Sequence, residues 1–216
     1  MRLAPYAEQS AQWPHSGRHI LAQFDRDTII VYQAYAAPIG SFAVQNQRFG
    51  GPFSFNRMSW IKPNFLWMMY RSGWGTKPGQ EMVLAIRIQI AGFNSILRSA
   101  VHSTFTKEFY DSEAAWRDAG DSSDVRLQWD PDHDPHGKPV ERRAIQLGLR
   151  GAILKNYATE WIVEITDLSA FIAEQRKILA EDPRRLITPE EAVYAPPPEI
   201  AARIGVAPPP FAANAF

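Results

Sequence analysis

Two apolar runs constrain the fold of this 216-residue chain more than any other feature of its sequence. Residues 27–35 contain Ile, Ile, Val and Tyr in succession, and residues 81–90 are almost continuously aliphatic. Runs of this length, rich in β-branched residues, are typical of buried strands. The fold is therefore expected to be organised around a sheet with two well-covered strands.

Helical patterns alternate with the strands. Pro38 suits the first turn of a helix that ends at Gly50, and Asn64 or Ser59 suits the N-cap of a helix through residues 65–71. The sequence predicts further helices at residues 93–101, 112–119, 149–157 and 168–180, and further strands at residues 125–129, 143–149 and 160–166.

These elements predict a single compact α+β domain over residues 1–182. Residues 125–129 and 143–149 alternate like an antiparallel pair, so the sheet is expected to be mixed, mostly antiparallel, and either continuous or split. Residues 183–216 are rich in proline and predict an extended, partly ordered tail that the fold does not need.

Composition excludes several classes of protein. The absence of cysteine excludes disulfides, thiolate metal sites and a cysteine nucleophile. The longest apolar run, residues 65–70, is too short to cross a bilayer, and no apolar leader follows Met1. A cytoplasmic protein with no membrane partner is the resulting expectation.

The 23 basic and 23 acidic residues balance, but their distribution is uneven. Residues 28–80 contain five basic side chains and no Asp or Glu, although the average composition predicts about five or six acids in that span. One interpretation is a core segment whose few charges are basic. The other is a site for a phosphate, a carboxylate or a nucleotide, because nearby acids would repel such a ligand.

The densest part of this segment is residues 52–74. As a helix, it places Trp67, Tyr70, Arg71 and Trp74 at positions i, i+3, i+4 and i+7, which form one aromatic face with an arginine in it. Such a face can stack a base while arginine holds a phosphate. The apolar residues on its other sides equally favour a buried helix, in which the basic side chains need an anionic partner.

Two other segments contain candidate functional groups. Residues 130–137 hold three carboxylates and two imidazoles, but two prolines and a misplaced glycine favour a solvated hairpin connection over a metal loop, so we predict no metal. In the predicted strand 160–166, Glu160 and Glu164 lie on one face, either as paired carboxylates for chemistry or as solvent-facing residues.

Residues 57–74, Arg-Met-Ser-Trp-Ile-Lys-Pro-Asn-Phe-Leu-Trp-Met-Met-Tyr-Arg-Ser-Gly-Trp, are preceded by Val-Tyr-Gln-Ala-Tyr at 31–35. This combination resembles the signature of the family catalogued as domain of unknown function 4291. The resemblance extends from about residue 27 to 167 and includes residues 128–130, 143–148 and 160–162. It implies membership of that family but no particular chemistry.

The order of elements also resembles ADP-ribosyltransferases, which split NAD at the nicotinamide–ribose bond. This resemblance implies that Glu160 supports the oxocarbenium-like transition state, and that Gln33 or Tyr35 lines the nicotinamide pocket. It assigns the diphosphate to Arg57 and Arg71. The chain departs from that pattern, since its first strand lacks the expected Arg or His and no Ser-Thr-Ser or His-Tyr-Glu set is present.

We therefore hypothesise a nucleotide-binding enzyme that consumes NAD and transfers ADP-ribose to a nucleic acid or another acceptor. The predicted binding residues are Gln33, Tyr35, Arg57, Trp60, Lys62, Trp67, Tyr70 and Arg71, with Glu160 as the catalytic residue. The alternative is a non-catalytic module that binds single-stranded nucleic acid or a nucleotide by stacking on Trp60, Trp67 and Trp74. Replacing Glu160 distinguishes them, because only the enzyme needs its carboxylate.

Overall fold

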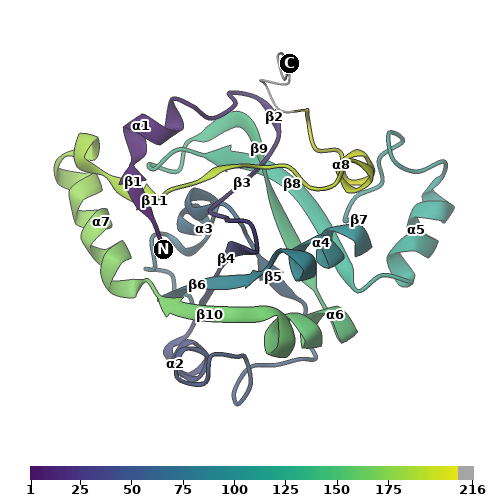
Figure 1. Cartoon of the computed structure of the whole chain (residues 1–216), viewed down its shortest axis with the longest axis horizontal. Helices are drawn as coiled ribbons and strands as arrows, with labels where there is room; N and C mark the ends of the chain where they lie inside the picture. The colour runs from purple at the N-terminus through teal and green to yellow at the C-terminus, as the bar shows by residue number, and fades with distance from the viewer. Residues whose placement is uncertain (209–216) are drawn as a thin grey trace.

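A computed structural model gives the fold and describes residues 1–208. Its first sheet has the strand order β10 (Ile162–Asp167), β6 (Met82–Gln89) and β4 (Thr28–Tyr35), all antiparallel. The two apolar runs of the sequence are β4 and β6, which pair from Thr28 with Gln89 to Tyr35 with Met82. Both predicted strands are thus confirmed, and the structure shows that they are direct neighbours (Figure 1).

The second sheet has the order β2 (Gly17–Arg18), β9 (Pro139–Leu149), β8 (Val125–His133) and β7 (Ala100–His102). A further strand, β5 (Ser59–Ile61), pairs with β9. The β8–β9 hairpin is antiparallel, whereas β7 pairs with β8 in parallel and β2 pairs with β9 in parallel. The fold is therefore α+β with a split, mixed and mostly antiparallel sheet, as predicted.

The two sheets meet at residues 59–62, which we call the seam. On one side of the seam β5 pairs with β9, with Trp60 opposite Gly148. On the other side the backbone of Lys62 exchanges two hydrogen bonds with Tyr32 of β4, with N···O distances of 2.7 and 3.2 Å. A single short segment thus connects the sheets.

Two hydrophobic clusters cover the two faces of the first sheet. Ile29 and Val31 belong to a cluster that fills the space between the sheets and under α4 (Ile90–Ser99). The alternate residues Ile30 and Tyr32 belong to the other cluster, which packs on α3 (Phe65–Ser72) and α7 (Ser169–Glu181). Burial on both faces explains why β4 shows no polar alternation.

The C-terminal segment is more structured than an extended tail within residues 183–208. It contributes β11, which pairs with β1, and β12, which pairs with β3, followed by α8. The end of the predicted tail, residues 209–216, lies outside the described residues. The remaining bounds are β1 (Leu3–Pro5), α1 (Tyr6–Ser10), β3 (Ile20–Ala22), α2 (Ala37–Asn46), α5 (Glu113–Asp121), α6 (Gly151–Asn156), π-helix η1 (Tyr157–Trp161), 3₁₀ helix η2 (Pro183–Arg185), β11 (Ile187–Pro189), β12 (Ala192–Tyr194) and α8 (Pro198–Ile204).

The predicted strand 160–166 begins later than expected. Residues 157–161 form η1, and β10 starts only at Ile162. Trp161 lies directly over Gly92 of α4, where an added Cβ would stand 2.6 Å from the indole Cγ. Glu160 therefore lies on η1 and not on a strand. Among residues 1–208, no helix combines the length and apolarity needed to cross a bilayer.

Candidate functional site

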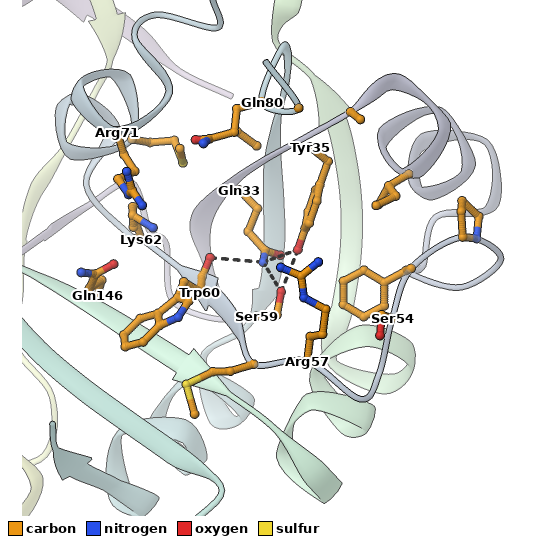
Figure 2. Close-up of a pocket in the computed structure, with 18 of the residues that line it drawn as sticks. Gln33, Tyr35, Ser54, Arg57, Ser59, Trp60, Lys62, Arg71, Gln80 and Gln146 are labelled. Carbon is orange, nitrogen blue, oxygen red and sulfur yellow. Dashed lines mark hydrogen bonds between the residues drawn. The ribbon is translucent and has the colours of Figure 1, made fainter. Parts of the chain in front are cut away.

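A cavity of about 650 Å³ opens at the seam. Its walls come from the end of β4, the segment 52–62, α3 and the β8–β9 hairpin. Six of the eight predicted binding residues line it: Gln33, Tyr35, Arg57, Trp60, Lys62 and Arg71. Within residues 1–208, no Asp or Glu is among the lining residues. The structure thus gathers the basic and polar side chains of the acid-free segment around one space (Figure 2).

The floor of the cavity is a hydrogen-bonded network around Gln33, which is buried in β4. Its Nε2 donates to the Tyr35 hydroxyl (2.7 Å), to Ser59 Oγ (2.9 Å) and to the carbonyl oxygen of Trp60 (3.2 Å), as Figure 2 shows. Its Oε1 accepts a hydrogen bond from the Tyr157 hydroxyl at 2.8 Å. These contacts fix the orientation of the amide and tie β4 to the seam.

Burial raises the pKa of the Tyr35 phenol above its usual value, although a hydrogen bond with Ser59 opposes the shift. The two hydroxyl oxygens lie 2.7 Å apart, and either can be the donor. Tyr35 therefore stays neutral at physiological pH and offers the cavity a hydroxyl without a negative charge.

Lys62 is the buried cation of the cavity. Only 4% of the residue is exposed, and within residues 1–208 its ammonium group has neither a hydrogen-bond acceptor nor an ion-pair partner. Burial lowers the pKa of the Lys62 amine to about 8, and the nearby Arg71 charge lowers it further, whereas Asp130 acts in the opposite direction. A buried cation without a protein partner is costly, so its free side faces a space where an anion can bind.

Arg57 and Arg71 lie on opposite sides of the cavity, with Lys62 next to Arg71 (Figure 2). Both arginines are exposed, and within residues 1–208 neither guanidinium group makes an ion pair. The sequence analysis allowed that the basic side chains of residues 52–74 are buried and need an anionic partner, but Arg57 and Arg71 are exposed. The desolvated cation is Lys62, because its side chain projects from the seam while the arginines are at the rim.

Trp60 lines the cavity from the seam, and Gly148 of β9 makes room for it. An added Cβ at Gly148 would stand 2.6 Å from Met58 Sδ and 3.0 Å from Trp60 Cε2. A side chain at position 148 would therefore displace the indole or the thioether. This glycine belongs to the 143–148 segment of the sequence motif.

The hairpin side of the cavity carries amides that the sequence analysis did not select. Gln128 and Gln146 face each other across β8 and β9, and both line the cavity. Gln146 Nε2 donates to Gln128 Oε1 and to Asp130 Oδ2, both at 2.7 Å. Polar side chains inside otherwise apolar strands were the available signal, and both glutamines lie in motif segments.

Trp67 and Tyr70, by contrast, do not line the cavity. Trp67 is 6% exposed, and its ring lies beside the stacked rings of Tyr70 and His133, with centroids 5.3 and 5.1 Å away. Trp74 packs on Phe65 and donates through Nε1 to the Pro135 carbonyl at 3.1 Å. The predicted aromatic face is thus a packing surface, and Trp60, Trp67 and Trp74 do not form one exposed stacking platform.

Glu160 also lies apart from the cavity. It is exposed on η1, between the α6 segment and β10. Two other carboxylates contact lining residues from outside: Asp130 through Gln146, and Glu81 through the backbone N–H of Gly79 at 2.8 Å. Burial raises the pKa of Asp130, an effect opposed by the Gln146 hydrogen bond and by Lys62.

The acidic loop at residues 130–137 is less solvated than predicted. Asp132 is 1% exposed and forms an ion pair with the buried Arg142, at 2.6 Å between Oδ2 and Nη2. His133 stacks on Tyr70, and Asp134 Oδ1 accepts the backbone N–H groups of residues 136 and 138. The Asp132 and Asp134 carboxylates thus have partners in the hairpin or beside it, whereas His133 Nδ1 is buried without a hydrogen-bond partner in the described chain. Within residues 1–208, no three His, Asp or Glu side chains gather in a metal-binding arrangement.

Comparisons with known proteins place these observations in one family context. A family model described as "Domain of unknown function (DUF4291)" matches residues 19–194, which include every residue that lines the cavity. No curated protein matches the chain.

Proposed function

Since the chain belongs to the DUF4291 family, whose description names no activity, we propose a function from its cavity: it binds a nucleotide or another phosphate-bearing small molecule there. The observation that carries this proposal is the buried Lys62 side chain, which has no ion-pair partner within residues 1–208 and lines an acid-free cavity. A phosphate in that space would provide the missing counter-charge.

The chain's treatment of its other buried cation supports this interpretation. Arg142 is 8% exposed and is fully accommodated by the Asp132 carboxylate and by the Pro14 carbonyl, at 2.7 Å from Nη1. Lys62 is as deeply buried, yet residues 1–208 provide no such acceptor. Together with Arg57 and Arg71, it presents three cations to one ligand, and arginine suits bidentate phosphate binding.

The size and lining of the cavity fit a nucleotide better than a simple ion. Its volume of about 650 Å³ lies within the usual range of small-molecule sites. Trp60, Phe53 and Met58 add apolar surface for a ring, and the amides of Gln80 and Gln146 add hydrogen-bonding groups. NAD, ADP-ribose and ATP are therefore the first ligands to test.

The experiment is a thermal-shift titration with NAD, ADP-ribose, ATP and a short single-stranded oligonucleotide, each at millimolar concentration. Adenosine and nicotinamide riboside serve as controls without phosphate. We expect the phosphate-bearing compounds to raise Tm, since a ligand at about 100 times its Kd adds about 2.7 kcal/mol of stability. The shift should disappear in Lys62→Met and persist in Lys177→Met, an exposed lysine on α7. No shift with any phosphate compound would refute the proposal.

We propose ADP-ribosyl transfer from NAD as the reaction of this site. The resemblance to ADP-ribosyltransferases assigns the nicotinamide to Gln33 or Tyr35 and the diphosphate to Arg57 and Arg71. The proposal is supported because all four residues line the same cavity, the first two at its floor and the arginines at its rim. Neither Glu160 nor Asp130 lines the cavity, but Asp130 accepts a hydrogen bond from the lining residue Gln146, so Asp130 is the carboxylate that we assign to the transition state.

The reaction is tested by measuring nicotinamide release from NAD, with a mixture of RNA, single-stranded DNA and protein offered as acceptors. We expect Asp130→Asn to reduce release at least tenfold and Glu160→Gln to leave it within twofold. Loss of activity in Glu160→Gln alone would restore the original assignment. Binding of NAD without any release would favour the non-catalytic alternative.

A further inference from the structure

We propose that Lys62 is a carbonyl-reactive amine, which forms an imine with an aldehyde or ketone that also carries a phosphate or carboxylate group. The inference deepens the proposed function, because it assumes that the same cavity holds the anionic part of the ligand. It adds a covalent step and a substrate class that simple phosphate binding does not imply.

The position of Lys62 makes its amine both accessible to a ligand and fixed in space. Two backbone hydrogen bonds to Tyr32 hold the residue at the seam, and its side chain lines the cavity. In Figure 2 the amine lies between Arg71, Gln146 and Trp60. The other five lysines of the chain are exposed: Lys77, Lys107, Lys138, Lys155 and Lys177. Lys62 is therefore distinguished by burial as well as by location.

The surroundings of Lys62 favour the neutral form of the amine, which is the nucleophile. Burial and the Arg71 charge lower the pKa of Lys62 to about 8, against the weaker opposing effect of Asp130. An adjacent cation and a poorly solvated pocket both activate a lysine as a nucleophile, and Arg71 provides the cation here. With no carboxylate in the lining, no ion pair competes for the amine.

Imine formation follows from this arrangement without any further reactant. The lone pair of the Lys62 Nζ attacks the carbonyl carbon, so that a C–N bond forms and the carbonyl oxygen gains a proton. The resulting carbinolamine loses water, and a C=N bond replaces the C=O bond. No electrons are exchanged with an oxidant or reductant. Arg57 and Arg71, at the two sides of the cavity, hold the anionic group of the same molecule.

The test uses pyridoxal 5′-phosphate and its dephosphorylated counterpart pyridoxal as a matched pair of carbonyl probes. The full chain is incubated with each probe and sodium cyanoborohydride, and the reduced adducts are located by peptide mass spectrometry. We expect one adduct at Lys62, formed at least tenfold faster than at any exposed lysine, with pyridoxal 5′-phosphate faster than pyridoxal. In Lys62→Arg, only slow labelling of exposed lysines should remain, whereas Lys177→Arg should label like the wild type.

The outcomes separate this inference from the function on which it rests. If pyridoxal 5′-phosphate raises Tm but Lys62 is not labelled, phosphate binding stands and imine formation is refuted. If Lys62 is labelled equally fast by both probes, the amine is reactive but the phosphate site is refuted. Uniform labelling of all six lysines refutes imine formation as a property of this site, and the absence of a Tm shift with pyridoxal 5′-phosphate refutes the phosphate site. Melting curves of Lys62→Arg and Lys62→Met confirm that the variants are folded, and either folded variant suffices.

Discussion

Lys62 and Arg142 are the buried Lys and Arg side chains within residues 1–208, and they illustrate two solutions to the burial of a cation. Arg142 is balanced by Asp132, so removing either partner would leave an unpaired buried charge. Lys62 has no such partner in the described chain, so its charge is a burden on the ligand-free fold. Its removal should therefore stabilise the protein.

The first prediction concerns this charge and pH. The pKa of Lys62 is about 8 in the fold against an ordinary 10.5, so between these values the unfolded chain binds more protons than the folded chain. The free energy of unfolding should then rise with pH across that window, by up to about 3 kcal/mol in all. Urea denaturation at about pH 7 and about pH 9.5 measures the rise.

Lys62→Met provides the control. It should be more stable than the wild type at about pH 7, and the difference should shrink towards about pH 9.5. Comparing the two proteins cancels the contribution of the buried Tyr32 and Tyr157. Burial raises the pKa of both phenols, so both proteins lose stability above about pH 10 by the same amount. A variant less stable than the wild type at about pH 7 would mean that Lys62 has a partner in the fold.

The second prediction concerns the rim arginines. Because Arg57 and Arg71 are exposed and have no carboxylate partner within residues 1–208, replacing each with Gln strands no buried charge. The melting temperature of the ligand-free protein should stay nearly unchanged. Affinity for a bound nucleotide should fall about tenfold for each, or about 1.4 kcal/mol. Isothermal titration measures it, with Arg48→Gln, outside this cavity, as control. Unchanged affinity in both rim variants would show that neither Arg57 nor Arg71 contacts the phosphate.

Charge distribution along the sequence pointed to a segment that lines the cavity, but not to the depth of each side chain. Most residues that line the cavity come from the acid-free span 28–80. Helical spacing predicted Trp67 and Tyr70 as ligand contacts, but neither residue lines the cavity, since a spacing of three and four gives a shared face but not what covers it. Here His133, at the end of β8 and distant in sequence, covers that face.

At the scale of elements, α3 is the helix that presents Arg71 to the cavity, and its N-terminus is held from two directions. Asn64 Oδ1 accepts the backbone N–H of Trp67 at 2.6 Å, which confirms one of the predicted caps. The buried Glu191, from the loop between β11 and β12, accepts the Phe65 N–H at 2.7 Å. The C-terminal segment thus contributes directly to the position of a cavity wall.

The third prediction follows from this second cap. Glu191→Ala should lower the free energy of unfolding by about 2 kcal/mol, because the Phe65 N–H loses its buried acceptor. Glu191→Gln should recover most of the loss. Burial raises the pKa of Glu191 and favours its neutral form, which the uncharged Gln side chain imitates. Urea denaturation measures both. Glu190→Ala is the control, because Glu190 forms an exposed ion pair with Arg2 at 2.7 Å. Equal effects at positions 190 and 191 would rule out the capping role.

Elements with strong local signals were predictable, and those set by tertiary contacts were not. The β8–β9 hairpin follows from alternation in both strands, and β4 and β6 follow from their apolar runs. The sequence placed Glu160 on a strand because residues 160–166 alternate like one. In the structure residues 157–161 form η1, and Trp161 packs on Gly92 of α4. Nothing near residue 160 in the sequence signals that contact.

At the scale of the whole molecule, the two sheets share one hydrophobic cluster, and the C-terminal segment closes part of it. The cluster includes Val31 from the first sheet and Leu147 from the second, together with Ile200 and Ile204 of α8. The Trp129 indole Nε1 donates to the Ile204 carbonyl at 2.8 Å. Proline content suggested a dispensable tail, because it excludes long regular elements but does not report burial.

The fourth prediction is therefore that truncation after Asp182 abolishes the cooperative transition. The deletion removes Tyr194, Ile200 and Ile204, which are at most 6% exposed, and each buried side chain of this kind contributes about 1.5–3 kcal/mol. The sum is comparable to the whole stability of a typical domain, about 5–15 kcal/mol. We expect the truncated protein to be insoluble or, if it is soluble, to show a broad transition in circular dichroism melting.

A chain that ends at Pro208 keeps every described contact of α8 and serves as the control, which should melt cooperatively. The double variant Ile200→Ala, Ile204→Ala separates packing from chain length, and it should lose about 4 kcal/mol or more because both methyl-rich side chains leave cavities in the shared cluster. A cooperative, soluble protein truncated at Asp182 would show that the two sheets and α4 form a sufficient core. The cavity at the seam would then be expected to survive without the Glu191 cap, and titration of the same truncated chain with the proposed nucleotide would test this.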